Sequence, residues 1–244
     1  MNDHINLPEL PFAAWKETRM TLHLIMQIIG KVRLKMTPRK NHWWYITHYL
    51  SVNGFSTSPV PMGDGINTFE INYDVINSQV KIVTSLGKTK VIPLQNGFTV
   101  ADFYRQLITE LESLNIQPHI IDKAFDVGIE KRFSEITEYH HYEQEYIHKF
   151  WQTMLWSDGV FKEFSGRFYG KTCPSQIYWH HLDLAVTRFS GKKGPKMDAS
   201  APLAEKDAYS HEVISFGYWA GDDNVQEGAC VLFLYLPFTR WFGK

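Results

Sequence analysis

The stretch that most limits the possible folds is a regular alternation of apolar and polar residues over positions 69–84. Its first half places apolar side chains at every second position, namely Phe69, Ile71, Tyr73 and Val75. Alternate residues of a strand share one face, so this half predicts a strand with one buried side. Asn77 and Ser78 form a turn signal and lead into a second run at 80–84. The sequence therefore predicts an antiparallel hairpin.

A third strand and a helix follow the hairpin. Residues 89–94 extend the antiparallel arrangement after a turn at 86–88. Thr99 is a favourable N-cap for a helix over 100–114. One face of that helix carries the apolar residues Phe103, Leu107, Leu111 and Leu114. We expect this face to cover the sheet.

Before the hairpin, the spacing of apolar residues changes from that of a helix to that of a strand. Apolar residues of 15–29 recur at helical spacing, at Leu22, Ile25, Met26 and Ile29. After Gly30, basic and apolar residues alternate over 31–36, which predicts a strand with a basic face of Lys31, Arg33 and Lys35. Residues 43–52, rich in aromatic and β-branched side chains, predict the next strand.

The second half of the chain shows the same order of elements. Residues 122–142 form a polar, largely acidic connector, in which Phe125, Val127 and Ile129 could add a short strand. A long helix is expected over 143–164, followed by strands at 177–189, 209–219 and 229–237. Residues 190–207 are rich in Gly, Lys, Ala and Pro and could be a lid or disordered.

Five identical residues in the two halves are separated by 136 positions. The pairs are Trp15 and Trp151, Gly30 and Gly166, Lys35 and Lys171, Pro38 and Pro174, and Trp43 and Trp179. An internal duplication would explain them, and so would a coincidence between two similar orders of elements. The predicted fold is α+β, with largely antiparallel sheets packed by helices in two similar units. The predicted domains are 1–121 and 143–244, joined by 122–142, although one continuous domain is the alternative.

Composition narrows the class of protein. The formal net charge is −1, so no overall field draws the chain to nucleic acid or an anionic membrane. Cys173 and Cys230 are the only cysteines, too few for a disulfide framework or a cysteine zinc site. No segment is apolar enough to predict a secretion signal or a membrane span. We therefore expect a cytoplasmic protein without membrane contact.

The segment 178–183 carries the densest set of reactive side chains. If it is a strand, Trp179, His181 and Asp183 share one face, and His180 and Arg188 lie on the other. A carboxylate beside an imidazole can orient it as a general base or metal ligand, which makes His181 and Asp183 candidate catalytic residues. A structural hydrogen bond is the alternative. His211 and Glu212, on a neighbouring strand, could complete the set.

A second candidate surface combines positive charge with aromatic rings. Five basic residues and no acid occur in 31–40, and His42, Trp43 and Trp44 follow. Basic groups beside exposed rings bind single-stranded nucleic acids or phosphorylated ligands. A solvated basic strand beside two core tryptophans is the alternative. Phosphate-binding glycine loops and a serine nucleophile elbow are absent from the sequence.

Four strings of the sequence occur together in a known group of proteins. They are NHWW at 41–44, KEFSGRFYGK at 162–171, HLDLAVTRFSG at 181–191 and AYSHE at 208–212. In these strings the chain resembles a bacterial family of uncharacterised proteins, defined only as a domain of unknown function. The resemblance extends from about Trp15 to Trp219. It implies no activity, substrate or cofactor.

Three functional hypotheses follow. The first is a protein that binds a small anionic or aromatic molecule in a pocket of polar and aromatic residues, where Arg188 holds an anionic group and the rings stack. Its predicted lining is His42, Trp43, Trp44, Trp179, His180, His181, Asp183, Arg188, His211 and Glu212. The second is a hydrolase that uses His181 and Asp183, with or without a metal ion. The third is nucleic-acid binding through 31–44. The sequence identifies no cofactor and does not decide whether the protein is an enzyme.

Overall fold

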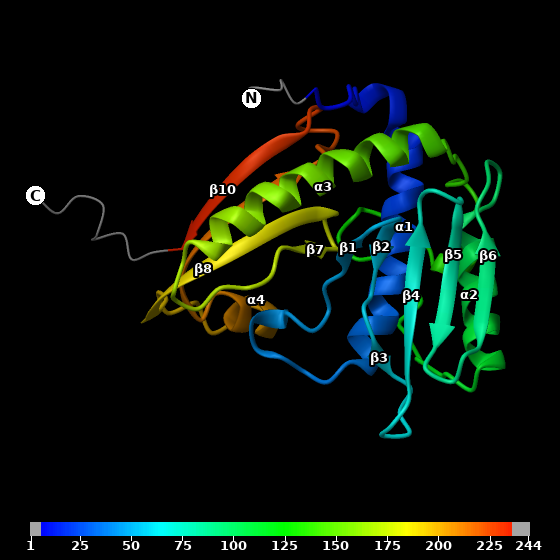
Figure 1. Cartoon of the computed structure of the whole chain (residues 1–244), viewed down its shortest axis with the longest axis horizontal. Coiled ribbons are helices and arrows are strands. Elements are labelled where there is room, and N and C mark those ends of the chain that lie inside the picture. Colours follow the sequence, from blue (N-terminus) through cyan, green and yellow to red (C-terminus); the bar gives the residue numbers. More distant parts are fainter. Residues whose placement is uncertain (1–5, 236–244) are drawn as a thin grey trace, which may run out of the picture.

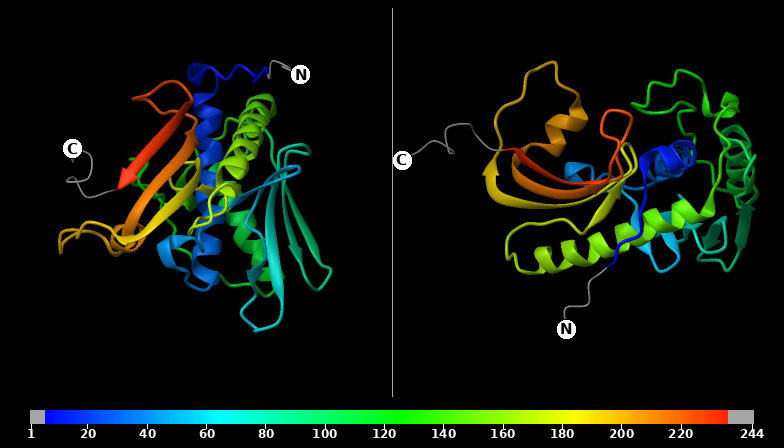
Figure 2. Two further views of the ribbon diagram at one scale, coloured as in Figure 1. Left: turned by 60° about the vertical axis from the view of Figure 1, so that its left-hand side comes forward. Right: turned by 90° about the horizontal axis from the view of Figure 1, so that it is seen from above.

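A computed structural model describes residues 6–235 and shows an α+β fold with two antiparallel sheets. A long helix, α1 (Phe12–Met36), runs between the two sheets (Figures 1 and 2). The other helices of the described residues are α2 (Val100–Ser113), α3 (Gln144–Gly166) and the short α4 (Leu203–Ala208). One cluster of buried apolar side chains extends through both sheets, from Ile71 to Leu184. No described helix is both long and apolar enough to cross a membrane.

The first sheet confirms the predicted hairpin. Its strands are β1 (Tyr49–Ser51), β2 (Gly54–Ser56), β3 (Val60–Pro61), β4 (Thr68–Asp74), β5 (Gln79–Thr84) and β6 (Thr89–Pro93). The order is β1-β2-β4-β5-β6, and β3 also pairs with β4. Tyr73 pairs with Val80 across the hairpin, and the alternate residues of β4 are buried as predicted.

Helix α2 is also confirmed, together with its cap. The hydroxyl of Thr99 accepts a hydrogen bond from the backbone N–H of Asp102, and the Asp102 carboxylate accepts one from the N–H of Thr99. This reciprocal pair satisfies two N–H groups that a helix start leaves without partners. Phe103, Leu107 and Leu111 are fully buried, and α2 contacts β6.

The second sheet has the order β10-β9-β8-β7. Its strands are β7 (Gln176–Tyr178), β8 (Asp183–Lys193), β9 (His211–Trp219) and β10 (Ala229–Tyr235). The single strand predicted at 177–189 is therefore wrong, because a turn at 179–182 separates β7 from β8. Leu182 takes a left-handed φ of 58° in that turn. The loop expected at 190–207 is partly strand and partly α4, and residues 236–237 of the last predicted strand lie outside the described part.

The strand predicted at 31–36 is wrong as well, because α1 continues without interruption to Met36. Gly30 does not end the helix. A Cβ at this position would overlap the indole ring of Trp179, so the glycine serves close packing instead. Lys31, Arg33 and Lys35 therefore do not share a strand face. Arg33 is buried and donates to the carbonyl of Thr57, whereas Lys35 is exposed.

The strand predicted at 43–52 is reduced to β1. Residues Asn41–Trp43 form a short 3-10 segment in which His42 and Trp43 have φ values of 57° and 61°. Basic residues and rings therefore do not form the strand surface on which the hypothesis of nucleic-acid binding was based.

The connector 122–142, which lies wholly within the described residues, contains no strand, and its regular element is a 3-10 turn, Phe133–Glu135. The two halves of the described chain show no internal repeat. Lys35 lies in a helix and its counterpart Lys171 in a loop, and within residues 6–235 the sheets have six and four strands. The division into two domains stays a prediction.

The contact between Gly30 and Trp179 gives a test of how α1 is held. We expect Gly30→Ala to lower the free energy of unfolding by about 1–3 kcal/mol, because the added methyl group displaces the indole ring. Gly159→Ala, inside α3 with open space at its Cβ, is the matched control and should stabilise by up to about 1 kcal/mol. Urea denaturation of both variants measures the difference. Equal stabilisation by the two substitutions would contradict the packing described.

Candidate functional site

Helix α1 carries three buried polar residues on one face, at Arg19, His23 and Gln27. They are four residues apart, so they lie one above another along the helix. Gln27 holds the connector, because its amide nitrogen donates to the carbonyl of Phe125 (2.9 Å) and its oxygen accepts from the Phe125 N–H (2.7 Å). We call these three residues the α1 polar stripe.

His23 holds the turn between β7 and β8. Its Nε2 lies 2.8 Å from the carbonyl oxygen of His180 and 3.1 Å from that of Trp179. Carbonyl oxygens only accept, so Nε2 carries the proton and Nδ1 has a free lone pair. Burial, helped by the charge of Arg19, lowers the pKa of His23 to about 3. His23 is therefore neutral, and its buried Nδ1 has no hydrogen-bond partner within residues 6–235.

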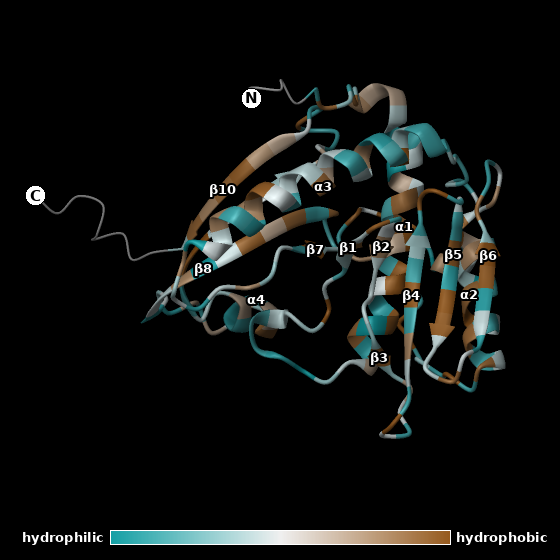
Figure 3. Ribbon diagram, in the orientation of Figure 1, coloured by the Kyte–Doolittle hydropathy of each residue, from teal (hydrophilic) through white to brown (hydrophobic). Residues whose placement is uncertain are grey.

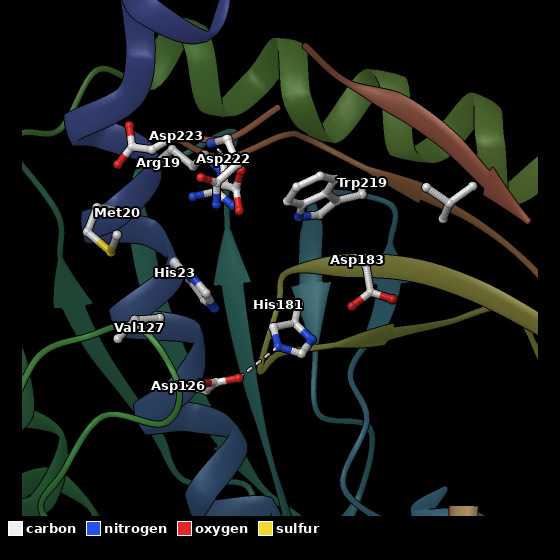
Figure 4. Close-up of a pocket in the computed structure, with 12 residues that line it drawn as sticks. Arg19, Met20, His23, Asp126, Val127, His181, Asp183, Trp219, Asp222 and Asp223 are labelled. Atoms are coloured by element: carbon white, nitrogen blue, oxygen red, sulfur yellow. Dashed lines mark hydrogen bonds and ion pairs between the residues drawn. The ribbon is translucent and has the colours of Figure 1, made fainter. Parts of the chain in front are cut away.

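A cavity of about 530 Å³ opens beside this stripe (Figure 4). Its walls come from α1, the connector, the turn before β8, the end of β9, the following loop and β10. The lining residues are Arg19, Met20, His23, Asp126, Val127, His181, Asp183, Trp219, Asp222, Asp223, Asn224 and Val231. We call it the α1 cavity.

Asp183 and Trp219 form one wall of the α1 cavity. Asp183 begins β8, Trp219 ends β9, and the two residues are directly paired across the strands. Paired residues point to the same face of a sheet. The Asp183 carboxylate makes no hydrogen bond or ion pair with another side chain of the described chain. Burial raises its pKa to about 6, although the nearby His181 acts in the opposite direction.

His181 lies on the opposite side of the cavity opening from α1 and points towards Asp126 (Figure 4). Its Nε2 is 3.5 Å from a carboxylate oxygen of Asp126, and both side chains are largely exposed. The predicted hydrogen bond between His181 and Asp183 is not formed, although both residues line the cavity. Asp126, from the connector, is the carboxylate that contacts the imidazole.

Among the described residues, Arg19 is the only Lys or Arg that lines the cavity. It is 5% exposed, and its Nε has no hydrogen-bond partner in that part of the chain. Burial lowers its pKa, and the charges of Asp222 and Asp223 oppose that change. Asp223 also forms an ion pair with Lys16 at 2.5 Å. The positive charges of Arg19 and Lys16 at this end of the cavity therefore lie near the negative charges of Asp222 and Asp223.

Comparison with known proteins shows which family the chain matches. A family model described as "Family of unknown function (DUF5996)" matches residues 7–237. The chain belongs to the DUF5996 family. No curated protein and no solved structure matches it. The family resemblance found in the sequence is confirmed, and the family carries no stated activity.

Three of the residues predicted to bind a ligand in this DUF5996 protein meet in a second place, away from the α1 cavity. His42 packs against Trp44, Phe189 and His211, with ring centres 5.1, 4.6 and 5.6 Å away. The Nζ of Lys171 donates to Nε2 of His42 (2.7 Å), and Nδ1 of His42 faces the carbonyls of Asp207 and Ala208. Burial and then Lys171 lower the pKa of His42. This ring cluster joins α4 to the 41–44 segment.

The remaining predicted residues have other contacts. Trp179 is buried, donates to the carbonyl of Ile46 (2.9 Å) and stacks on His180. Trp43 packs against Tyr45. Arg188 donates to the carbonyl of Phe164 and lies over its ring, so it does not face the cavity. The buried Glu212 accepts from the hydroxyl of Ser190 (2.6 Å).

His181 and Asp183 are far from His211 and Glu212, the pair expected to complete a metal site with them. Asp183 pairs with Trp219 at one end of β9, and His211 is the first residue at the other end. His211 and Trp219 are eight positions apart along the strand, a distance of about 26 Å. Across residues 6–235, no three His, Cys, Asp or Glu side chains are grouped to hold a metal ion.

Arg19, His23, Asp126, Trp219 and Asp222 were not singled out in the sequence. One signal was present, because polar residues at helical spacing within an apolar helix indicate a buried polar face. The contribution of the connector and of the loop after β9 depends on the tertiary fold, and no local pattern indicated it.

Removing the Asp183 charge should stabilise this DUF5996 protein. The folded chain binds the Asp183 proton more tightly than an unfolded chain with a pKa of 3.8, so the ionised carboxylate destabilises the fold above about pH 6. We expect Asp183→Asn to raise the free energy of unfolding near pH 7 by on the order of 2 kcal/mol, and to lose this advantage near pH 4. Urea denaturation at the two pH values measures both effects.

Asp74 provides the matched control. It is also buried, and burial opposes its ionisation, but hydrogen bonds from Asn77 and Lys81 lower its pKa to about 2. Asp74→Asn should therefore destabilise the protein near pH 7. If both substitutions destabilise it equally, Asp183 has a protein partner and the description of the cavity is wrong.

Proposed function

We propose that this DUF5996 protein binds a small polar organic molecule in the α1 cavity. The observation that carries the proposal is that unpartnered polar groups converge there. Nδ1 of His23 and Nε of Arg19 lie one turn apart on α1 without a partner among the described residues, the Asp183 carboxylate begins β8 without a hydrogen bond from another side chain, and all three residues line one cavity. A buried polar atom without a partner destabilises a fold by about 1–3 kcal/mol. A ligand in the cavity would explain why polar groups of this kind are gathered around it.

The size and lining of the cavity support this proposal. About 530 Å³ is within the range of sites for small organic molecules. Met20, Val127, Trp219 and Val231 supply apolar surface, and the polar groups are few and localised. This combination favours binding of a molecule with a definite orientation.

Proton transfer to a bound molecule is the second candidate function. Asp183, whose pKa is raised to about 6, can hold or release a proton near neutral pH, and His181 lines the same cavity. Asp126 contacts the imidazole, so it would orient His181 in place of Asp183. Hydrolysis remains the reaction class that this arrangement suggests. A cytoplasmic location stays a prediction from the sequence.

Two substitutions on one strand test the binding site. Val231 lines the cavity, whereas its neighbour Leu232 points to the other face of β10, a strand coloured mainly as hydrophobic in Figure 3. The two side chains are 42% and 56% exposed. Val231→Trp should fill the cavity and Leu232→Trp should leave it open. We expect small polar compounds that shift backbone amide signals of residues 181–183 and 219–224 in NMR spectra to lose this effect in Val231→Trp only.

A compound set that gives no shifts in these segments, or shifts that survive Val231→Trp, would contradict binding in the α1 cavity. New resonances of a converted compound in the same spectra would favour proton-transfer catalysis over binding alone.

A further inference from the structure

We infer that the α1 cavity selects an organic cation, a molecule with a primary ammonium group that lies between the Asp183 carboxylate and the Trp219 indole. This inference rests on the proposed function and names its ligand class. It differs from the anionic alternative of the anionic or aromatic ligand expected from the sequence, because Arg188, the residue assigned to hold an anionic group, donates to the carbonyl of Phe164.

The first support is the pairing of Asp183 with Trp219. Residues directly opposed on neighbouring antiparallel strands have Cβ atoms about 4.5–5.5 Å apart, so an acid and an indole form one continuous wall. A carboxylate attracts an ammonium group by charge and hydrogen bonding. The face of an indole attracts the same cation through its electron-rich ring. Both residues line the cavity and suit the same group.

The second support is the distribution of charge around the cavity. Arg19 and Lys16 lie beside Asp222 and Asp223, which leaves that end close to neutral. Asp126 contacts His181 at the opening. Asp183 forms no ion pair with a basic side chain among the described residues, and His181 is the basic residue whose charge acts on it. The cavity therefore has an excess of negative charge at Asp183, where a cation is stabilised and an anion is repelled.

The third support is the hydrogen-bonding capacity of His23. Its proton is on Nε2, shared with the carbonyls of Trp179 and His180, so Nδ1 can only accept. His23 is 3% exposed and lines the cavity, and this acceptor has no partner within the described chain. Asp183 and His23 therefore contribute acceptors to the cavity lining, which favour a ligand that donates hydrogen bonds. An ammonium group offers three N–H donors and no acceptor.

Three ring compounds of similar size test the inference, because they differ mainly in charge: benzylamine, benzyl alcohol and benzoate. We expect benzylamine to bind the full chain at least about tenfold more tightly than the other two near pH 7, as measured by NMR titration. Asp183→Asn and Trp219→Leu should each weaken benzylamine binding by about tenfold. Glu163→Gln, which removes an exposed carboxylate of α3, should leave it unchanged.

Each result supports or overturns a defined part of the inference. If benzyl alcohol or benzoate binds as tightly as benzylamine and Val231→Trp blocks all three, the cavity binds ligands but does not select cations. Cation selection is overturned in the same way if Asp183→Asn leaves benzylamine binding intact. If none of the three compounds binds, the ligand class is overturned. If the wider set of polar compounds also fails to shift cavity signals, the proposed binding function is overturned with it.

Discussion

The fold depends on the way α1 satisfies its buried polar residues. A helix that runs between two sheets has little access to water, so each polar side chain on it needs a partner from the protein. Gln27 finds its partner in the backbone of Phe125, and His23 in the carbonyls of His180 and Trp179. These bonds tie α1 to the connector and to the turn between β7 and β8. Gly30 lets the Trp179 indole complete the contact.

The same stripe explains why the α1 cavity lies where it does. One ring nitrogen of His23 bonds to backbone carbonyls, and the other has no partner in the described chain. The turn that His23 holds places His181 and Asp183 in the cavity wall. A buried carboxylate kept there without an ion pair opposes stability. Residues that oppose stability and share one cavity are typical of a site shaped for a ligand. Structure and proposed function thus depend on the same few contacts.

The sequence predicted correctly the elements that are specified by residues close together in the chain. The β4–β5 hairpin follows directly from alternation and the start of helix α2 from the N-cap Thr99. The end of α1 was missed because alternate basic residues imitate a strand, whereas the burial of Arg33 depends on a distant carbonyl. The turn at 179–182 was missed for a similar reason. His181 and Asp183 were identified as candidates, but their neighbours Asp126 and Trp219 are set by tertiary structure.

The most direct test of this account is the protonation state of His23, read from the nitrogen chemical shifts of its ring over a range of pH. The account predicts a neutral ring with its proton on Nε2 that persists well below the ordinary titration range, since its pKa is lowered to about 3. Nδ1 should show the shift of an unprotonated nitrogen throughout. A ring that gains its second proton near pH 6.5, or that carries its single proton on Nδ1, would contradict the contact on which both the fold and the cavity depend.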